Sequence, residues 1–149
     1  MNAIRRYGSR YGMQGRAIGV GVFVRIRGWL ECDEQQLTQV REIAEADDAD
    51  RTYSGGWAFP PRQYNFTNWV FFGAEMRAQS VDWFLDRLRS VARIPASDDD
   101  DLITGLFFVS HEVDGMSEWQ VRDGTVLIQA ASQDLPGSAS AVRAGSATR

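Results

Sequence analysis

The stretch that decides the fold is YSGGWAFPPRQYNFTNWVFFGAEM, residues Tyr53 to Met76, in which a glycine-opened and proline-closed aromatic segment leads into a dense aromatic strand. Pro60 and Pro61 cannot donate to a β-ladder, so they stop a short strand around Gly56 to Phe59. A longer strand is predicted from Thr67 to Met76. It is apolar on both faces over most of its length, as a central strand is. The stretch therefore predicts a sheet-centred domain.

Two segments before this stretch also have regular patterns. Residues Ala17 to Cys32 alternate apolar residues with others at period two, which predicts a strand. Gly28 marks a bulge or a close backbone approach near the end of that strand. Asp33 then provides an N-cap with Gln36 three residues later, and an apolar stripe at helical spacing continues to Ala46. We expect a helix that lies with one face on the sheet.

The C-terminal half contains a second helix and three more strands. Ser80 can cap a helix over Val81 to Arg93, whose apolar residues recur every three or four positions. Pro95 prevents its continuation. The pairs Asp114-Gly115 and Asp123-Gly124 are hairpin signals flanked by strand-like residues. They predict a meander of three strands, Leu102 to Val113, Met116 to Arg122 and Thr125 to Gln129.

The order of elements is therefore β-α-β-β-α-β followed by two hairpin-linked strands. We interpret it as an α+β fold, a ferredoxin-like two-layer sandwich extended by a C-terminal β-meander, with two helices on one face of an antiparallel sheet. Residues 17–131 form this single domain, since 149 residues that are 44% hydrophobic suffice for one core. Residues 1–16 are interpreted as a flexible basic arm, with Met13 as an alternative start, and residues 132–149 as a disordered tail.

The charge of the chain is unevenly distributed. Every basic side chain is arginine, which indicates GC-rich coding in a bacterium or a phage. Residues 17 to 136 contain ten arginines and all twenty acidic residues, so this part has a net charge of −10. An acidic body disfavours nucleic acid and favours a basic partner. A single cysteine, the lack of an apolar signal segment and the lack of any run near the ~20 residues of a membrane span predict a cytoplasmic protein.

The chain lacks the residue patterns of common catalytic and metal sites. His111, the only histidine, follows Ser110 in a predicted strand, where neighbouring side chains point to opposite faces and cannot share a proton. Cys32 precedes a helix N-terminus, but its phase in the strand places it in the core. One histidine and one cysteine are too few for zinc, and the aspartates after Ala46 lack the glycine and glutamate of a calcium loop. We therefore expect no cofactor, no metal and no enzymatic activity.

Aromatic and arginine residues of the sheet are the strongest functional signal. If two helices cover one face, the other face exposes rings and guanidinium groups, which are frequent in protein interfaces. The predicted partner-binding residues are Phe23, Arg25, Arg27, Trp29, Trp57, Trp69, Phe71, Trp119, Asp98, Asp99, Asp100 and Asp101. The favoured function is a small acidic non-enzymatic binding protein that blocks a basic partner surface, as immunity proteins and phage-encoded inhibitors do. Such a surface also suits a homodimer.

Two other functions are open on the sequence. The first is a dimeric small-ligand-binding or enzymatic ferredoxin-like domain, with a pocket lined by Trp57, Trp69 and Trp119 near His111. The second is single-stranded nucleic-acid binding, in which bases stack on the aromatic face. The negative charge of the body disfavours this second alternative.

Overall fold

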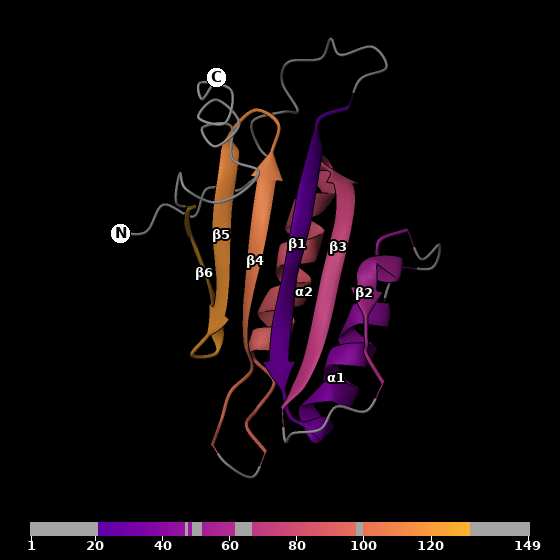
Figure 1. The fold of residues 1–149 in the computed structure, drawn as a ribbon, viewed down its shortest axis with the longest axis vertical. Coiled ribbons are helices and arrows are strands. Elements are labelled where there is room, and N and C mark those ends of the chain that lie inside the picture. Colours follow the sequence, from indigo (N-terminus) through magenta and orange to yellow (C-terminus); the bar gives the residue numbers. More distant parts are fainter. Residues whose placement is uncertain (1–20, 47, 49–51, 62–66, 98–99, 132–149) are drawn as a thin grey trace, which may run out of the picture.

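The structure is a computed structural model that describes residues 21–46, 48, 52–61, 67–97 and 100–131. Over these ranges the chain forms an α+β fold with a six-stranded antiparallel sheet and two helices (Figure 1). The strands are β1 (Phe23–Cys32), β2 (Trp57–Ala58), β3 (Asn68–Arg77), β4 (Thr104–His111), β5 (Gly115–Arg122) and β6 (Thr125–Ala130). The helices are α1 (Glu34–Glu45) and α2 (Val81–Ala92). The predicted arm and tail lie outside the described residues.

The strands lie side by side in the order β2-β3-β1-β4-β5-β6, and every neighbouring pair is antiparallel. β1 occupies the centre, where β3 pairs with it from Phe23 opposite Arg77 to Cys32 opposite Asn68. The predicted antiparallel sheet and the predicted interior position of the aromatic strand β3 are thereby confirmed. Residues 17–20 of the predicted first strand lie outside the described ranges.

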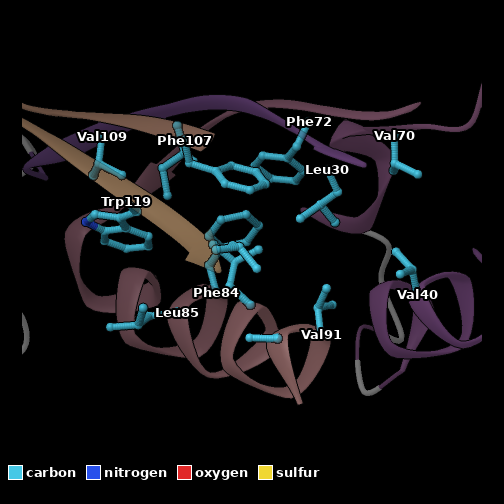
Figure 2. Close-up of a cluster of buried hydrophobic side chains, with 14 of the residues drawn as sticks. Leu30, Val40, Val70, Phe72, Phe84, Leu85, Val91, Phe107, Val109 and Trp119 are labelled. Carbon is cyan, nitrogen blue, oxygen red and sulfur yellow. The ribbon is translucent and has the colours of Figure 1, made fainter. Parts of the chain in front are cut away.

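Both helices pack on the same face of the sheet, and the hydrophobic core lies between them and the strands (Figure 1). Phe84 of α2 is at its centre, with its ring centroid 4.4 Å from that of Phe72 and 5.9 Å from that of Phe107. Figure 2 shows these rings between the strands and α2, with Trp119 alongside. No helix among the described residues is long and apolar enough to cross a membrane.

Of the two predicted helix N-caps, the one at α1 is confirmed and the one at α2 is wrong. The predicted capping box at α1 is confirmed. The Asp33 carboxylate accepts a hydrogen bond from the Gln36 backbone N–H at 2.8 Å, and the Gln36 side-chain oxygen accepts one from the Asp33 backbone N–H at 3.0 Å. The prediction that the Ser80 side chain caps α2 is wrong. Ser80 closes a short 3-10 turn, Ala78–Ser80, that runs directly into α2, so its backbone is already helical and its hydroxyl makes no cap.

The two predicted hairpins have different loops. Asp123 and Gly124 both have positive φ, 51° and 75°, as a two-residue type I′ turn requires. In the first hairpin His111 pairs with Gly115, so the loop consists of the three residues 112–114. Gly115, the first residue of β5, has a φ of 81°. The meander β4-β5-β6 forms as predicted.

Gly28 lies where the centre of β1 meets β4. A Cβ atom at this position would lie 2.2 Å from the Leu106 carbonyl oxygen and 2.7 Å from Cδ1 of Phe107. The strand register continues through Gly28 without an extra residue, so the close approach is present and the bulge is not. The missing side chain leaves room for the Phe107 ring, which packs against Phe84 in the core.

Candidate functional site

The sheet face turned away from the helices, called the open face below, is built by alternate residues of the strands. No helix or strand among the described residues covers it (Figure 1). Its members follow from the pairing, since residues opposite each other on antiparallel strands point to the same face. They are Phe23, Arg25, Arg27, Trp29 and Glu31 on β1, Trp69, Phe71, Gly73, Glu75 and Arg77 on β3, Thr104, Leu106, Phe108 and Ser110 on β4, Met116, Glu118, Gln120 and Arg122 on β5, and Thr125, Leu127 and Gln129 on β6.

An aromatic cluster occupies the β3–β1–β4 part of the open face. The rings of Trp69 and Phe71 are stacked, with centroids 6.4 Å apart and an interplanar angle of 12°. Phe71 is paired with Trp29, whose ring meets that of Phe108 edge-on at 6.5 Å. Trp69 is 38% exposed and Phe71 is 42% exposed, so this cluster presents large apolar surface to solvent. Contiguous exposed rings of this kind mark interaction surfaces.

Charges on the open face are balanced in sign. The face and its end at Phe23 carry four arginines and four glutamates, which are Arg25, Arg27, Arg77, Arg122, Glu31, Glu75, Glu112 and Glu118. Arg25 Nε lies 2.5 Å from Glu75 Oε1, and both side chains are more than half exposed, so this ion pair contributes at most about 1 kcal/mol to stability. The other described residues contain four arginines and eleven acidic residues. The acidic excess therefore lies off the open face, on the helix layer and the loops.

One acidic loop leads into the end of β4 that is paired with Glu31. Asp100 and Asp101 are exposed and lie shortly before Thr104, which pairs with Glu31, the neighbour of Trp69 across β1 and β3. The buried Gln36 side chain donates through Nε2 to the carbonyl oxygen of Asp101 at 2.9 Å and so ties this loop to the start of α1. Asp98 and Asp99 of the predicted acidic run lie outside the described residues.

Two of the tryptophans predicted for partner binding lie on the other face, so their predicted placement is wrong. Trp57 is paired with Phe72, a core residue, and its ring centroid is 4.9 Å from that of Phe72 and 6.0 Å from that of Phe84. Trp119 is fully buried and paired with Phe107. Both rings lie between the sheet and the helices, where Trp119 has no exposed surface and Trp57 is partly buried against the core.

The same finding removes the ligand pocket suggested by the sequence. Trp69 is on the open face while Trp57 and Trp119 are on the helix face, so the sheet itself separates the three rings. His111 is also on the helix face, where it is buried and its Nδ1 accepts from the backbone N–H groups of Val113 and Asp114, both at 3.1 Å. It holds the β4–β5 turn, and Ser110 beside it points to the open face.

Cys32 is buried in the core, as its phase in the strand predicts. Desolvation by burial, together with the neighbouring charge of Asp33, raises the pKa of the Cys32 thiol from 9.0 to about 12. The thiolate is therefore scarce at neutral pH, in spite of the helix that follows. Among the described residues no group of three or more His, Cys, Asp or Glu side chains is placed to hold a metal ion.

Leu106 and Phe108 are not among the residues predicted for partner binding, although both contribute to the open face. β4 is apolar on both faces, so its alternation does not reveal whether Phe107 or Phe108 faces the helices. Gly28 on β1 was the available signal. A glycine opposite Phe107 makes room for that ring on the helix face, which leaves Phe108 for the open face.

Asp48 organises the loop that leads from α1 to β2. Its carboxylate accepts from the backbone N–H groups of Thr52, Tyr53 and Ser54 at 3.2, 3.1 and 2.6 Å. Desolvation acts to raise the pKa of Asp48, but the hydrogen bonds from Ser54, Tyr53 and Thr52 outweigh it and hold the pKa below its ordinary value of 3.8. This loop sets the position of Tyr53, whose ring lies 6.0 Å from that of Trp83 on α2.

We expect Asp48→Asn to be less stable than the wild type at neutral pH. A depressed folded-state pKa gives stability that is full above the unfolded-state pKa and is lost as pH falls through the folded-state value. The difference between the two proteins should therefore be constant near neutral pH and shrink below about pH 4. Urea unfolding at a series of pH values measures it. A difference that persists unchanged in acid would show that the carboxylate charge is not what holds the loop.

Comparison with known proteins gives no relative for this arrangement, since no family model, curated protein or solved structure matches the chain.

Proposed function

We propose that the protein is a non-enzymatic binding module that contacts a protein partner through the aromatic cluster of its open face. The single observation that carries the proposal is the exposed Trp69–Phe71 stack, joined to Trp29 and Phe108, on a sheet face that no described element covers. Tryptophan and arginine are the residues most often found at the energetic centres of interfaces, and Arg25 and Arg27 border this cluster.

The proposed partner has an apolar patch with basic side chains beside it. Trp69 and Phe71 offer the apolar contact, and Glu31, Asp100 and Asp101 at the same end of the sheet offer negative charge. The balanced charge of the open face itself suits a partner patch that is apolar at its centre. In this proposal the protein acts as immunity proteins and phage-encoded inhibitors do, by covering a surface of its partner.

We also propose that the fold is ferredoxin-like with an added meander. Strands β1 to β4 lie in the order β2-β3-β1-β4, and each helix connects two strands that have a third, antiparallel strand between them, which is the split β-α-β pattern. β5 and β6 extend the sheet beyond β4. In this arrangement the helices occupy one face, and no described helix or strand covers the opposite face.

The test compares two variants that add the same negative charge. Trp69→Glu with Phe71→Glu alters the aromatic cluster, whereas Thr38→Glu with Gln39→Glu alters an exposed part of α1 on the far side of the molecule. We expect a partner captured by the wild type to bind the α1 variant equally and the open-face variant at least about 100-fold more weakly, because charged groups would be buried against its apolar patch. Isothermal titration calorimetry with the purified partner measures both values.

Two outcomes would count against this function. Undiminished binding of the Trp69→Glu with Phe71→Glu variant would show that the contact does not involve the open face, and equal weakening in both variants would show that only the added charge matters. Binding of a labelled single-stranded oligonucleotide that Trp69→Glu with Phe71→Glu abolishes would favour base stacking on the same rings. The basic character of the partner has its own readout, since Asp100→Asn with Asp101→Asn should slow association most strongly at low salt.

A further inference from the structure

The two edges of the sheet differ in how they are protected. β2, at one edge, is two residues long and is followed closely by Pro60 and Pro61. β6, at the other edge, has the sequence TVLIQA, with no charged residue and no proline, and among the described residues it pairs with β5 alone. Natural edge strands are normally blunted by charges, prolines or bulges, because their free backbone groups recruit other strands. β6 has none of these protections.

The hydrogen-bonding phase of β6 leaves a regular set of backbone groups facing outward. Ala131 N donates to the Met116 carbonyl oxygen at 3.1 Å, and the two-residue turn closes on the pair Arg122 and Thr125. Hydrogen-bonded pairs alternate with non-hydrogen-bonded ones in an antiparallel ladder, so Leu127 bonds inward to β5. The backbone N–H and C=O groups of Val126 and Ile128 therefore point away from the sheet.

Apolar side chains flank these groups on both faces of the edge. Leu127 is 44% exposed on the open face, and Ile128 is 39% exposed on the helix face. Val126 lies beside Ile128 on the helix face and packs partly against the core. An incoming strand would thus gain hydrogen bonds along the edge and apolar contacts above and below it.

We propose that two copies of this chain associate by antiparallel pairing of β6 with β6 of the second copy. In this pairing Leu127 faces Leu127 of the second copy on the open face, and Val126 faces Ile128 of the second copy on the helix face. The outward N–H and C=O groups of Val126 and Ile128 then pair with one another in both directions. The result is one continuous sheet of twelve strands with a twofold axis perpendicular to it.

A second copy is the occupant that the residues of β6 favour. The strand supplies both the donors and the acceptors that its own antiparallel image requires, and this register brings only apolar residues together at its centre. The chain has a net charge of −4, so association must avoid bringing acidic groups together, and β6 has no charge to oppose it. A single strand pair is a small interface, so we expect a dissociation constant in the range of about 1 to 100 µM.

The dimer goes beyond the proposed function, because it uses the β6 edge and not the aromatic cluster. With the twofold axis perpendicular to the sheet, both open faces lie on the same side of the twelve-stranded sheet. Two aromatic clusters would then be presented together, which raises the avidity for a partner that is itself dimeric or repeated.

The test measures the mass of the full chain by sedimentation equilibrium up to about 500 µM, well above the expected dissociation constant. We expect a mass that approaches twice the 16.7 kDa of one chain. Ile128→Lys should weaken the dimer at least about 100-fold, because each copy would place an ammonium group at the new strand pair. Leu102→Lys is the matched control, since Leu102 is also apolar and 39% exposed but is not on β6, and it should leave the dimer unchanged.

Cross-linking tests the register even if Ile128→Lys fails to fold. Leu127→Cys would place two thiols on a non-hydrogen-bonded pair with Cα atoms about 4.5 Å apart, within disulfide range, so mild oxidation should give a covalent dimer. Ile128→Cys should not cross-link, because the two Cα atoms would be more than about 7 Å apart. The native Cys32 is buried with a raised thiol pKa and serves as the unreactive background.

Three results would overturn the proposal. The first is a monomer throughout the concentration range. The second is a dimer that persists in Ile128→Lys and that Leu127→Cys does not cross-link. The third is a dimer that is lost in Trp69→Glu with Phe71→Glu but kept in Ile128→Lys. The last result would place the second copy on the open face. Failure of the proposed function is distinguishable, because the open-face variant would then bind the partner normally whatever the mass of the chain.

Discussion

Trp119→Ala is expected to lower the free energy of unfolding by about 3–5 kcal/mol, the range for deleting a large aromatic side chain from a core. Trp119 has no exposed surface, and its ring packs 6.5 Å from that of Phe84 between the sheet and α2. Little of the resulting cavity can close, because the strand pairing holds β4 and β5 in place. Urea denaturation with tryptophan fluorescence and far-ultraviolet circular dichroism measures the change.

The matched control is the same substitution on the other face of the sheet. Trp69→Ala removes an equally large ring, but this ring is 38% exposed, and we expect a loss below about 1.5 kcal/mol. The difference between the two losses in unfolding free energy measures how much more deeply the helix face of the sheet is buried than the open face. Equal losses would mean that Trp69 is covered in the native protein, and the open face would then not be available to a partner.

Gly28→Val is expected to destabilise the protein by about 4 kcal/mol or more, which is exceptional for one substitution and a large part of the stability of a domain this size. A Cβ at Gly28 would lie 2.2 Å from the Leu106 carbonyl oxygen and 2.7 Å from the Phe107 Cα atom. Both are backbone atoms of β4, so relief requires β4 to move away from β1 at the centre of the sheet. Thermal and urea unfolding report this change.

Gly73→Val provides the control for strand propensity. Gly73 is on β3, where a Cβ would meet no atom within 4 Å, and it is exposed. We expect this variant to be neutral or slightly more stable, because a β-branched residue suits an extended backbone better than glycine does. If Gly28→Val were as well tolerated as Gly73→Val, the close packing of β4 on β1 would be wrong.

The elements of the fold were predictable because their signals are local. The capping box at Asp33 and Gln36, the hairpin pairs at Asp114 and Asp123, and the proline stop after Phe59 each act within a few residues. Alternation along β1 also separated Arg25 and Arg27 from the buried residues, since one of its faces is uniformly apolar. These patterns lead to an α+β sheet of six strands with two helices, which the structure has.

The facing of Trp57 and Trp119 was not predictable in the same way. A strand's alternation says which residues share a face, but it does not say which face meets the helices when both carry apolar residues. β2 has only two residues, and in β5 the alternation sets Trp119 and Val121 against Gln120 and Met116 without naming the core side. The facing of each ring is set by cross-strand pairing, of Trp57 with Phe72 and of Trp119 with Phe107, and both pairs join residues on different strands of the sheet.

The sequence by itself therefore determined the strands, the helices, the hairpins and the arginine face of β1, because these depend on contacts between near neighbours. Only the tertiary structure decided which aromatic rings make the core and which make a surface. It divides Tyr53 to Met76 between the two faces, with Trp57 and Phe72 inward and Trp69 and Phe71 outward. Among the described residues it also leaves β6 as a sheet edge that pairs with β5 alone. The physical reason is that burial belongs to the sheet as a whole, whose register is set by long-range pairing and by the side on which the helices pack.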